Sequence, residues 1–445
     1  MVYRVFKWLL YWTVNGYFRS IHLEGMAHIP ATGPVLFVAN HNSAFMDPIV
    51  LAVHIKRPIY FLARGESFKS KLVSLFFTWL HMIPIYRPEI TPDEVHKNRT
   101  TFQKCFEHLE QGKTIMIFPE GSSMTDRTIR PLKTGTARIS LGAEEQYDFS
   151  LGVQIIPIGI NYSNPHYFRS DVFIRFGAPI LLDEYQSSYL KDPIKTVQDL
   201  TNVIHTRLEK LIVVVRDESI VLLVRDIERL YRSSLREELA PKHQASQDFY
   251  LSRQIVKAVA YHKQKRPKLY QKFQQKIRQY FEGLDQHQIR DTEFRKPGTA
   301  LYPNWSFFYF IIGFPWFLYG YLVNIGPYKT AAFLSRKVIV RKDFIGSMKL
   351  VFGMFVFLLF YILQMLLVAA WTTWYWGIVF VLSFYPSGVF TLNYLQQWYR
   401  HRAHSKYLKL KRDQKDLIHY LKTMREELLE ELDAGRQWYL EGIER

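Results

Sequence analysis

One stretch of this 445-residue chain, residues 350–399, carries no charged side chain. A helix needs about 20 apolar residues to cross the hydrocarbon core of a bilayer, so this stretch is long enough for two spans and a turn. We predict one span over residues 350–371 and a second over residues 374–395, joined by a short turn at Thr372 and Thr373. A buried hairpin in a soluble core is the alternative. It is disfavoured because soluble cores seldom lack charge over such a length.

A further apolar segment lies upstream, within the uncharged residues 297–328, and its middle contains Gly313 and Pro315. Basic side chains precede and follow this segment, so by the positive-inside rule both of its flanks face the cytoplasm. A straight span would place one of those flanks on the other side of the membrane. We therefore predict a re-entrant or interfacial segment at about residues 305–325, broken at Gly313 and Pro315. A plain third span is the alternative.

The net charge of +18, from 58 Lys and Arg against 40 Asp and Glu, predicts an anionic partner. Nucleic acid, a membrane surface and a phosphorylated substrate all fit that description. Much of the charge lies beside the apolar segments, at residues 257–278, 329–349 and 400–415, where it would face anionic lipid headgroups. We therefore expect membrane phospholipids as partners and no nucleic acid. The one Cys excludes a disulfide framework and a thiolate zinc cluster.

The first 24 residues are rich in Trp and Tyr and show a narrow polar stripe at Arg4, Lys7, Tyr11 and Asn15. A helix of this kind is typical of the headgroup plane of a membrane, so we predict an interfacial amphipathic helix over residues 1–24. An ordinary core helix is the alternative.

Residues 25–190 alternate short apolar runs with helical patterns, which predicts an α/β domain with a mixed, largely parallel sheet flanked by helices. We expect six strands, at residues 35–39, 59–63, 82–86, 114–118, 155–160 and 172–176. A helical connector over residues 191–296 is expected to lead into the membrane region, residues 297–399. A basic and then amphipathic C-terminal helix should cover residues 400–445.

Polar residues follow the predicted strand 35–39, beginning with Asn40 and His41, and Asp47 comes shortly after. The end of a strand is where α/β domains place their sites. We expect His41 in the loop and Asp47 in or near the first turn of the next helix. Asp47 can then hold the imidazole in one tautomer and leave its other nitrogen free to act as a base. The alternative is a His–Asp pair that only caps the turn.

Residues after two further predicted strands could bind an anion, through backbone groups at one strand end and through an arginine at the other. Pro119, Glu120, Gly121 and Ser122 follow the predicted strand 114–118, where a Gly–Ser backbone can approach a phosphate closely. Arg87 follows the predicted strand 82–86, and an arginine there can make bidentate bonds to phosphate. A tight turn and a solvated arginine are the simpler interpretations of each signal alone. Three such signals within one region together favour a site.

The sequence resembles the glycerolipid acyltransferases, the PlsC-like family of glycerol-3-phosphate and 1-acylglycerol-3-phosphate (lysophosphatidate) acyltransferases. The four ordered blocks of that family are all present: Asn40-His41 with Asp47, then IPIYR at 83–87, FPEGS at 118–122 and VQIIPI at 153–158. Arg64-Gly65-Glu66 resembles the family's basic-x-Glu segment. The family usually has four residues between His and Asp, whereas this chain has five, as in a branch of glycerol-phosphate acyltransferases.

The resemblance implies direct transfer of an acyl group from a thioester to a glycerol hydroxyl, with His41 as the base and Asp47 orienting it. Arg87 would bind the acceptor phosphate, while Pro119, Glu120, Gly121 and Ser122 shape its pocket and Lys133 assists. Lysophosphatidate is the expected acceptor, with glycerol 3-phosphate or another lysolipid as alternatives. Acyl-CoA or acyl-carrier protein would be the donor substrate, and we expect no bound cofactor and no metal.

Two other classes of protein compete with this interpretation. A catalytically inactive membrane scaffold would keep the same sequence blocks without their chemistry. An α/β-hydrolase is disfavoured because Gly121-Ser122-Ser123 does not form the GxSxG nucleophile elbow.

Overall fold

The computed structural model describes residues 2–68, 70–125, 127–237, 244–295, 305–338 and 341–444. These residues form two compact units. The first unit holds the described residues within Met1–Arg216, His243–Phe249 and Ser335–Met354. The second holds those within Asp217–Lys242, Tyr250–Leu334 and Phe355–Arg445. The first unit is therefore discontinuous in sequence, because a short segment near residue 345 returns to it.

The first unit is built on one eight-stranded sheet of order β1-β7-β6-β2-β5-β3-β4, in which β8 also pairs with β6. All neighbours are parallel except β6 with β7 and β6 with β8, which confirms the predicted mixed, largely parallel sheet. The strands are β1 (Ser20–Glu24), β2 (Val35–Ala39), β3 (Ile59–Arg64), β4 (Met82–Ile85), β5 (Thr114–Ile117), β6 (Gln154–Tyr162), β7 (Asp171–Phe176) and β8 (Ile180–Leu181).

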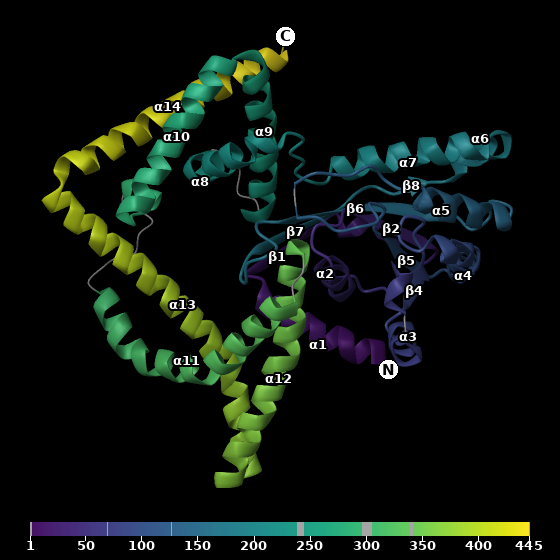
Figure 1. Ribbon diagram of the computed structural model, residues 1–445, viewed down its shortest axis with the longest axis horizontal. Helices are drawn as coiled ribbons and strands as arrows, with labels where there is room; N and C mark the ends of the chain where they lie inside the picture. Colours follow the sequence, from purple (N-terminus) through teal and green to yellow (C-terminus); the bar gives the residue numbers. More distant parts are fainter. Residues whose placement is uncertain are drawn as a thin grey trace. The chain divides into compact units, whose positions relative to one another are not determined.

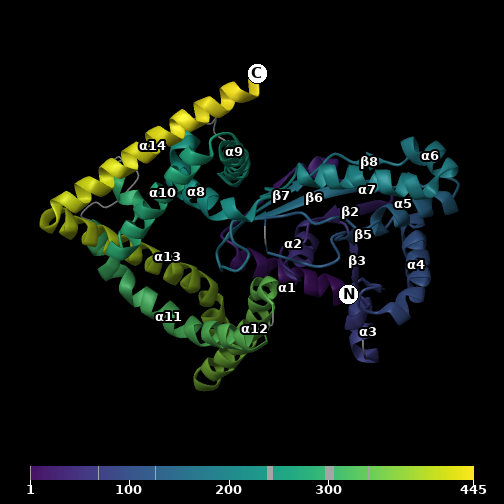
Figure 2. The same cartoon turned by 45° about the horizontal axis from the view of Figure 1, so that its top comes forward.

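Helices cover both faces of this sheet. In Figure 1, α1 (Val2–Tyr17) and α2 (Met46–His54) lie on one side of the strands, and α5 (Gly135–Gln146) and α7 (Pro193–Glu209) lie on the other. The turned view shows α4 (Asn98–Glu110) beside α5 (Figure 2). Two shorter helices, α3 (Lys71–Trp79) and α6 (Gln186–Lys191), complete the set.

The central strand β2 explains why both faces need cover. All five of its residues are buried, and their side chains alternate between two hydrophobic clusters. Val35, Phe37 and Ala39 join the cluster that contains α1 and α2, whereas Leu36 and Val38 join the cluster that contains α4, α5 and α7. A strand buried on both faces is typical of a parallel sheet. This packing fixes the carboxyl end of β2, from which the polar residues emerge.

The second unit is helical. Its helices, some of which extend into the first unit, are α8 (Val221–Glu237), α9 (Gln244–Lys265), α10 (Pro267–His287), α11 (Trp305–Val338), α12 (Ile345–Trp371), α13 (Trp374–Asp413) and α14 (Lys415–Glu444). Short 3₁₀ turns across the described chain are η1 (Met26–His28), η2 (Gly65–Ser67), η3 (Pro92–Lys97), η4 (Asp183–Tyr185), η5 (Glu218–Ile220), η6 (Asp291–Phe294) and η7 (Lys342–Phe344).

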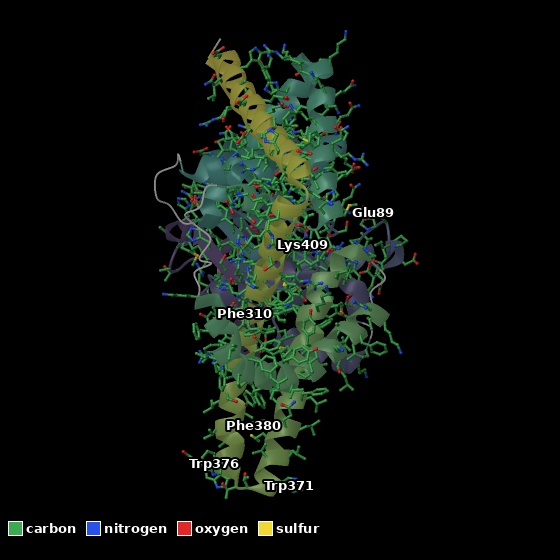
Figure 3. The ribbon with its side chains drawn as sticks, turned by 90° about the vertical axis from the view of Figure 1, so that its left-hand side faces the viewer. Glu89, Phe310, Trp371, Trp376, Phe380 and Lys409 are labelled. Carbon is green, nitrogen blue, oxygen red and sulfur yellow. The ribbon has the colours of Figure 1, made fainter. Side chains whose placement is uncertain are left out.

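Within the described residues, three helical segments are long and apolar enough to cross a membrane: Phe308–Val338, Ile345–Trp371 and Trp374–Asp413. The last two form a hairpin. Figure 3 shows Trp371 and Trp376 at its tip, with Lys409 toward the opposite end of α13. The predicted start of the membrane region at residue 297 lies outside the described residues.

Helix α11 differs from the expectation in its secondary structure, because the chain stays helical through Gly313 and Pro315. Proline removes one helical hydrogen bond and displaces a carbonyl, which in water would favour a break. In apolar surroundings a break would leave still more backbone groups unpaired, so the helix continues where neighbours can satisfy them. Near this proline, Tyr394 Oη of α13 donates to the Phe310 carbonyl at 2.9 Å. How α11 lies in a bilayer stays a prediction.

Candidate active site

His41 and Asp47 are in direct contact. His41 lies in the loop that leaves β2, and Asp47 lies in the first turn of α2, as expected. The His41 Nδ1 to Asp47 Oδ2 distance is 2.8 Å. Asp47 is fully buried, whereas 16% of the His41 side chain is exposed. Among the residues that the structure describes, none hydrogen-bonds the other ring nitrogen, Nε2. The arrangement is therefore that of a base held by a carboxylate and open on its outer side.

The Asp47 carboxylate is held by two further donors. The Ser43 backbone N–H donates to Oδ2 at 2.8 Å, and the Tyr162 hydroxyl at the end of β6 donates to Oδ1 at 2.7 Å. Burial, and then the negative charge of Asp47, raise the pKa of Tyr162 well above its usual value, so the hydroxyl keeps its proton. Hydrogen bonds of this kind favour the ionised form of a carboxylate and fix its orientation. Asp47 can therefore stabilise a protonated His41.

The loop that follows β5 lies against the His41 loop. Phe118 stacks on the imidazole with ring centroids 4.3 Å apart, and the backbone N–H of His41 donates to Glu120 Oε1 at 2.9 Å. Burial raises the pKa of Glu120, although the His41 N–H and the Arg130 guanidinium act in the opposite direction. Gly121 has a φ of +75°, which favours glycine at this turn. Glu120 thus joins the two loops that carry the predicted site residues.

Arginine side chains hold three successive carbonyl groups of this loop. Arg87 donates to the Gly121 carbonyl at 3.1 Å, Arg130 donates to that of Ser122, and Arg341 donates to that of Ser123 at 2.9 Å.

Each of these arginines also pairs with a carboxylate. Arg87 lies 3.0 Å from Glu66, Arg130 lies 3.2 Å from Glu120, and Arg341 lies 3.0 Å from Asp343. A charged donor forms stronger hydrogen bonds than a neutral one. The backbone of the loop is consequently held at each of its three peptide carbonyls.

The remaining predicted residues lie around the same loop. The Pro119 carbonyl accepts the backbone N–H of Lys133 at 2.9 Å. The Lys133 ammonium, however, pairs with Glu89 at 2.7 Å, while the end of its side chain packs beside Gly121. The structure therefore brings His41, Asp47, Arg87 and Lys133 to one edge of the sheet together with the residues 119–122. It assigns no substrate contact to any of them.

Several residues of this site were not predicted. Tyr162 ends β6, so the rule that selected His41 and Arg87 at strand ends could have selected it too. Arg130 lies in a segment without periodicity, and Arg341 is 218 residues away from the carbonyl that it contacts. No local pattern marks such contacts. Cys105 is buried in α4, where desolvation raises the pKa of its thiol to about 12, so it is unsuited to act as a nucleophile.

Residues 20–161 match the family model described as Acyltransferase. Glycerol-3-phosphate O-acyltransferase 1 of Saccharomyces cerevisiae is 26% identical over 326 residues, which cover 54% of this chain and 43% of that protein. The 1-acyl-sn-glycerol-3-phosphate acyltransferase of Borreliella burgdorferi is 22% identical over 192 residues, which cover 43% of this chain and 71% of that protein.

Among solved structures, the 1-acyl-sn-glycerophosphate (LPA) acyltransferase PlsC of Thermotoga maritima matches with a TM-score of 0.32 and 19% identity. That match covers 45% of this chain and 79% of the other. This chain spans less than half the length of the yeast relative. The region that matches, residues 20–161, contains His41, Asp47, Arg87 and the loop after β5. By these matches, residues 20–161 form an acyltransferase domain similar in sequence to those of glycerolipid acyltransferases.

Proposed function

We propose that the chain is a membrane-bound O-acyltransferase that moves a fatty acyl group from an acyl thioester to the hydroxyl of lysophosphatidate in phospholipid synthesis. The observation that carries this proposal is the His41–Asp47 pair, in which a buried carboxylate holds Nδ1 and Nε2 stays open. The membrane helices supply the setting in which a lysolipid is found.

The reaction follows from this geometry. His41 Nε2 takes the proton of the acceptor hydroxyl while the oxygen attacks the thioester carbonyl, and Asp47 stabilises the imidazolium that forms. The tetrahedral intermediate then collapses, the C–S bond breaks, and the ester remains on the acceptor. The leaving thiolate has a pKa near 8.5 and takes up the proton from His41 or water. No covalent enzyme intermediate is needed, and we expect neither a metal nor a bound cofactor.

Two phosphorylated acceptors fit this reaction. Lysophosphatidate and glycerol 3-phosphate both present a hydroxyl near a phosphate, and Arg87 is the residue that we propose binds this phosphate. The five-residue spacing between His41 and Asp47 and the yeast relative's name favour glycerol 3-phosphate as the second candidate. The donor is acyl-CoA or acyl-carrier protein, since both present a thioester.

We also propose that the acyltransferase domain faces the cytoplasm. Basic residues follow α13, at Arg400, Arg402, Lys406 and Lys409, and the cytoplasmic ends of spans are enriched in Lys and Arg. An even number of spans between the domain and these residues would place both on that side.

A panel of acceptors with labelled acyl-CoA tests the reaction, using the purified chain and its His41→Ala variant. We expect transfer to lysophosphatidate, and a loss of about 10²-fold or more in His41→Ala because general-base catalysis contributes that much. His54→Ala is the matched control, since His54 lies at the far end of α2 and its Nδ1 faces the Val50 carbonyl. Equal transfer by the wild type and by His41→Ala would refute the proposal that this chain catalyses the reaction through His41. Activity on none of the acceptors would favour a catalytically inactive scaffold.

A further inference from the structure

The segment between α11 and α12 is packed against the acyltransferase domain within the first unit. The buried Asp343 accepts a hydrogen bond from the Ser123 hydroxyl, and the Phe344 ring lies edge-on to Phe45 with centroids 5.5 Å apart. A few residues later, Gly346 approaches so closely that an added Cβ would lie 2.0 Å from the Pro165 carbonyl oxygen. Leu350 is buried in the same hydrophobic cluster as α2. The segment is therefore an integral part of the wall of the site.

Arg341 in this segment has hydrogen-bonding capacity to spare. Its Nε donates to Asp343 Oδ1 at 3.1 Å, and its Nη2 donates to Asp343 Oδ2 at 3.0 Å and to the Ser123 carbonyl at 2.9 Å. The other terminal nitrogen, Nη1, makes no hydrogen bond to any described part of the chain, and 45% of the side chain is exposed. Arg341 can thus bind a ligand without leaving the loop that it supports.

A second arginine, Arg64, has no hydrogen-bond partner among the residues that the structure describes. Arg64 ends β3 and is half-buried, yet within the described ranges its guanidinium forms no hydrogen bond or ion pair. Burial, and then the positive charges of Arg87 and Arg341, lower its pKa. In Arg87 the Nε is buried and likewise unpaired among the described residues. Glu66 and Asp343 balance two of these three cations, which leaves one excess positive charge.

An uncompensated, partly buried guanidinium is unfavourable unless an anion occupies the site. We propose that Arg341 is a substrate-binding residue that receives a phosphate monoester together with Arg64 and Arg87. The inference rests on the proposed acyl transfer, and it makes the segment between two membrane helices part of the substrate site. Two substrates carry this group, the glycerol phosphate of the acceptor and the 3′-phosphate of CoA, so kinetics must separate them.

The decisive variant is the full-length double substitution Arg341→Gln with Asp343→Asn, which removes both charges and leaves no unpaired buried carboxylate. Asp343→Asn alone is the control, because an amide oxygen can still accept from the Ser123 hydroxyl. We expect the double variant to raise the KM of the phosphorylated acceptor about tenfold or more, with kcat changed less than threefold, since a charged hydrogen bond is lost from binding. Asp343→Asn should leave that KM unchanged or lower it.

A second experiment varies the acyl donor. If the CoA phosphate is the ligand, the KM of acyl-CoA rises instead, and the difference between wild type and double variant disappears with acyl-dephospho-CoA. Either result supports an anion-binding role for Arg341. Unchanged KM values for both substrates would overturn it, as would an equal loss of kcat in Asp343→Asn and the double variant, which indicates a structural ion pair.

A binding measurement separates failure of this inference from failure of the proposed function. Inorganic phosphate and glycerol 3-phosphate should raise the melting temperature of the wild-type chain and do so less in the double variant, whether or not acyl transfer occurs. If wild type transfers acyl groups but its melting temperature and that of the double variant respond equally to phosphate, the function stands and the role of Arg341 is refuted.

Discussion

At the scale of single residues, Asp47 is the most constrained side chain of the site, because three donors converge on a carboxylate with no solvent exposure. An ionised group in such a position depends on every one of its partners. His41, the Ser43 backbone and Tyr162 therefore act as one unit, and the tyrosine is the partner that can be removed with least disturbance.

We expect Tyr162→Phe to lower kcat for acyl transfer about tenfold or more, since a hydrogen bond to a charged group contributes about 1.5–3 kcal/mol. The ring remains, so its stacking with Phe18 at 5.9 Å is kept and the fold should survive. Tyr167→Phe is the control, because Tyr167 is 66% exposed. An unchanged kcat in Tyr162→Phe would show that Asp47 does not need this donor.

His41, Arg87 and the residues 119–122 share one property, which is that they follow a recognisable strand. His41 and Arg87 were found in this way, and the Gly121 loop follows β5. The partners that hold them were not predicted, because Arg341 reaches the loop only through the tertiary fold. Lys133 was expected to assist in the phosphate pocket, but its ammonium pairs with Glu89, a contact that no sequence pattern shows.

At the scale of elements, the strands in the interior of the sheet were predicted to within about two residues, because continuous apolar runs mark buried parallel strands. The edge strand β1 was not predicted. It is short, none of its five residues is fully buried, and it pairs only with β7. The helical course of α11 through Pro315 was not predicted either, because a proline within a helical pattern favours a break in water.

The packing of the first turn of α12 can be tested with two glycines of the same helix. Gly346→Ala should destabilise the protein by about 1–3 kcal/mol, because overpacking forces the Pro165 backbone to move. Gly353→Ala should be neutral or slightly stabilising, since no atom lies within 4 Å of its added Cβ. The melting temperature of the purified chain measures both. Equal melting temperatures of the two variants would show that α12 does not pack tightly against the domain at Gly346.

At the scale of the whole molecule, the contacts of α11 with α13 and α12 show which parts of these helices lie side by side. Phe310 lies against Trp398 of α13, and further along α11 Gly320 closely approaches Ser387. At about 1.5 Å per residue, Trp398 is roughly 36 Å and Ser387 roughly 20 Å along α13 from the hairpin tip. Gly326 then lies beside Phe360 of α12. Helix α11 therefore lies beside the part of α13 that is remote from the hairpin tip, and its re-entrant course in a bilayer stays a prediction.

We expect a matching pattern of labelling in sealed vesicles, using single cysteines in a Cys105→Ala background. Lys104→Cys in the acyltransferase domain and Asp413→Cys at the end of α13 should react with an impermeant maleimide from one side. Thr372→Cys at the hairpin tip should react from the other. A spanning α11 reverses this result, placing Thr372 with Lys104 and Asp413 on the opposite side.

The discontinuity of the first unit has a consequence for the order of synthesis. A ribosome delivers residues 1–216 long before the segment Ser335–Met354 that belongs with them. Until that segment emerges, Ser123 lacks Asp343 and Arg341, and the cluster that will receive Leu350 is incomplete. By then the ribosome has already made α11, which is long and apolar enough to enter a membrane. A nascent chain thus reaches its finished site only after its membrane segment has left the ribosome, which ties the onset of its chemistry to arrival at the bilayer.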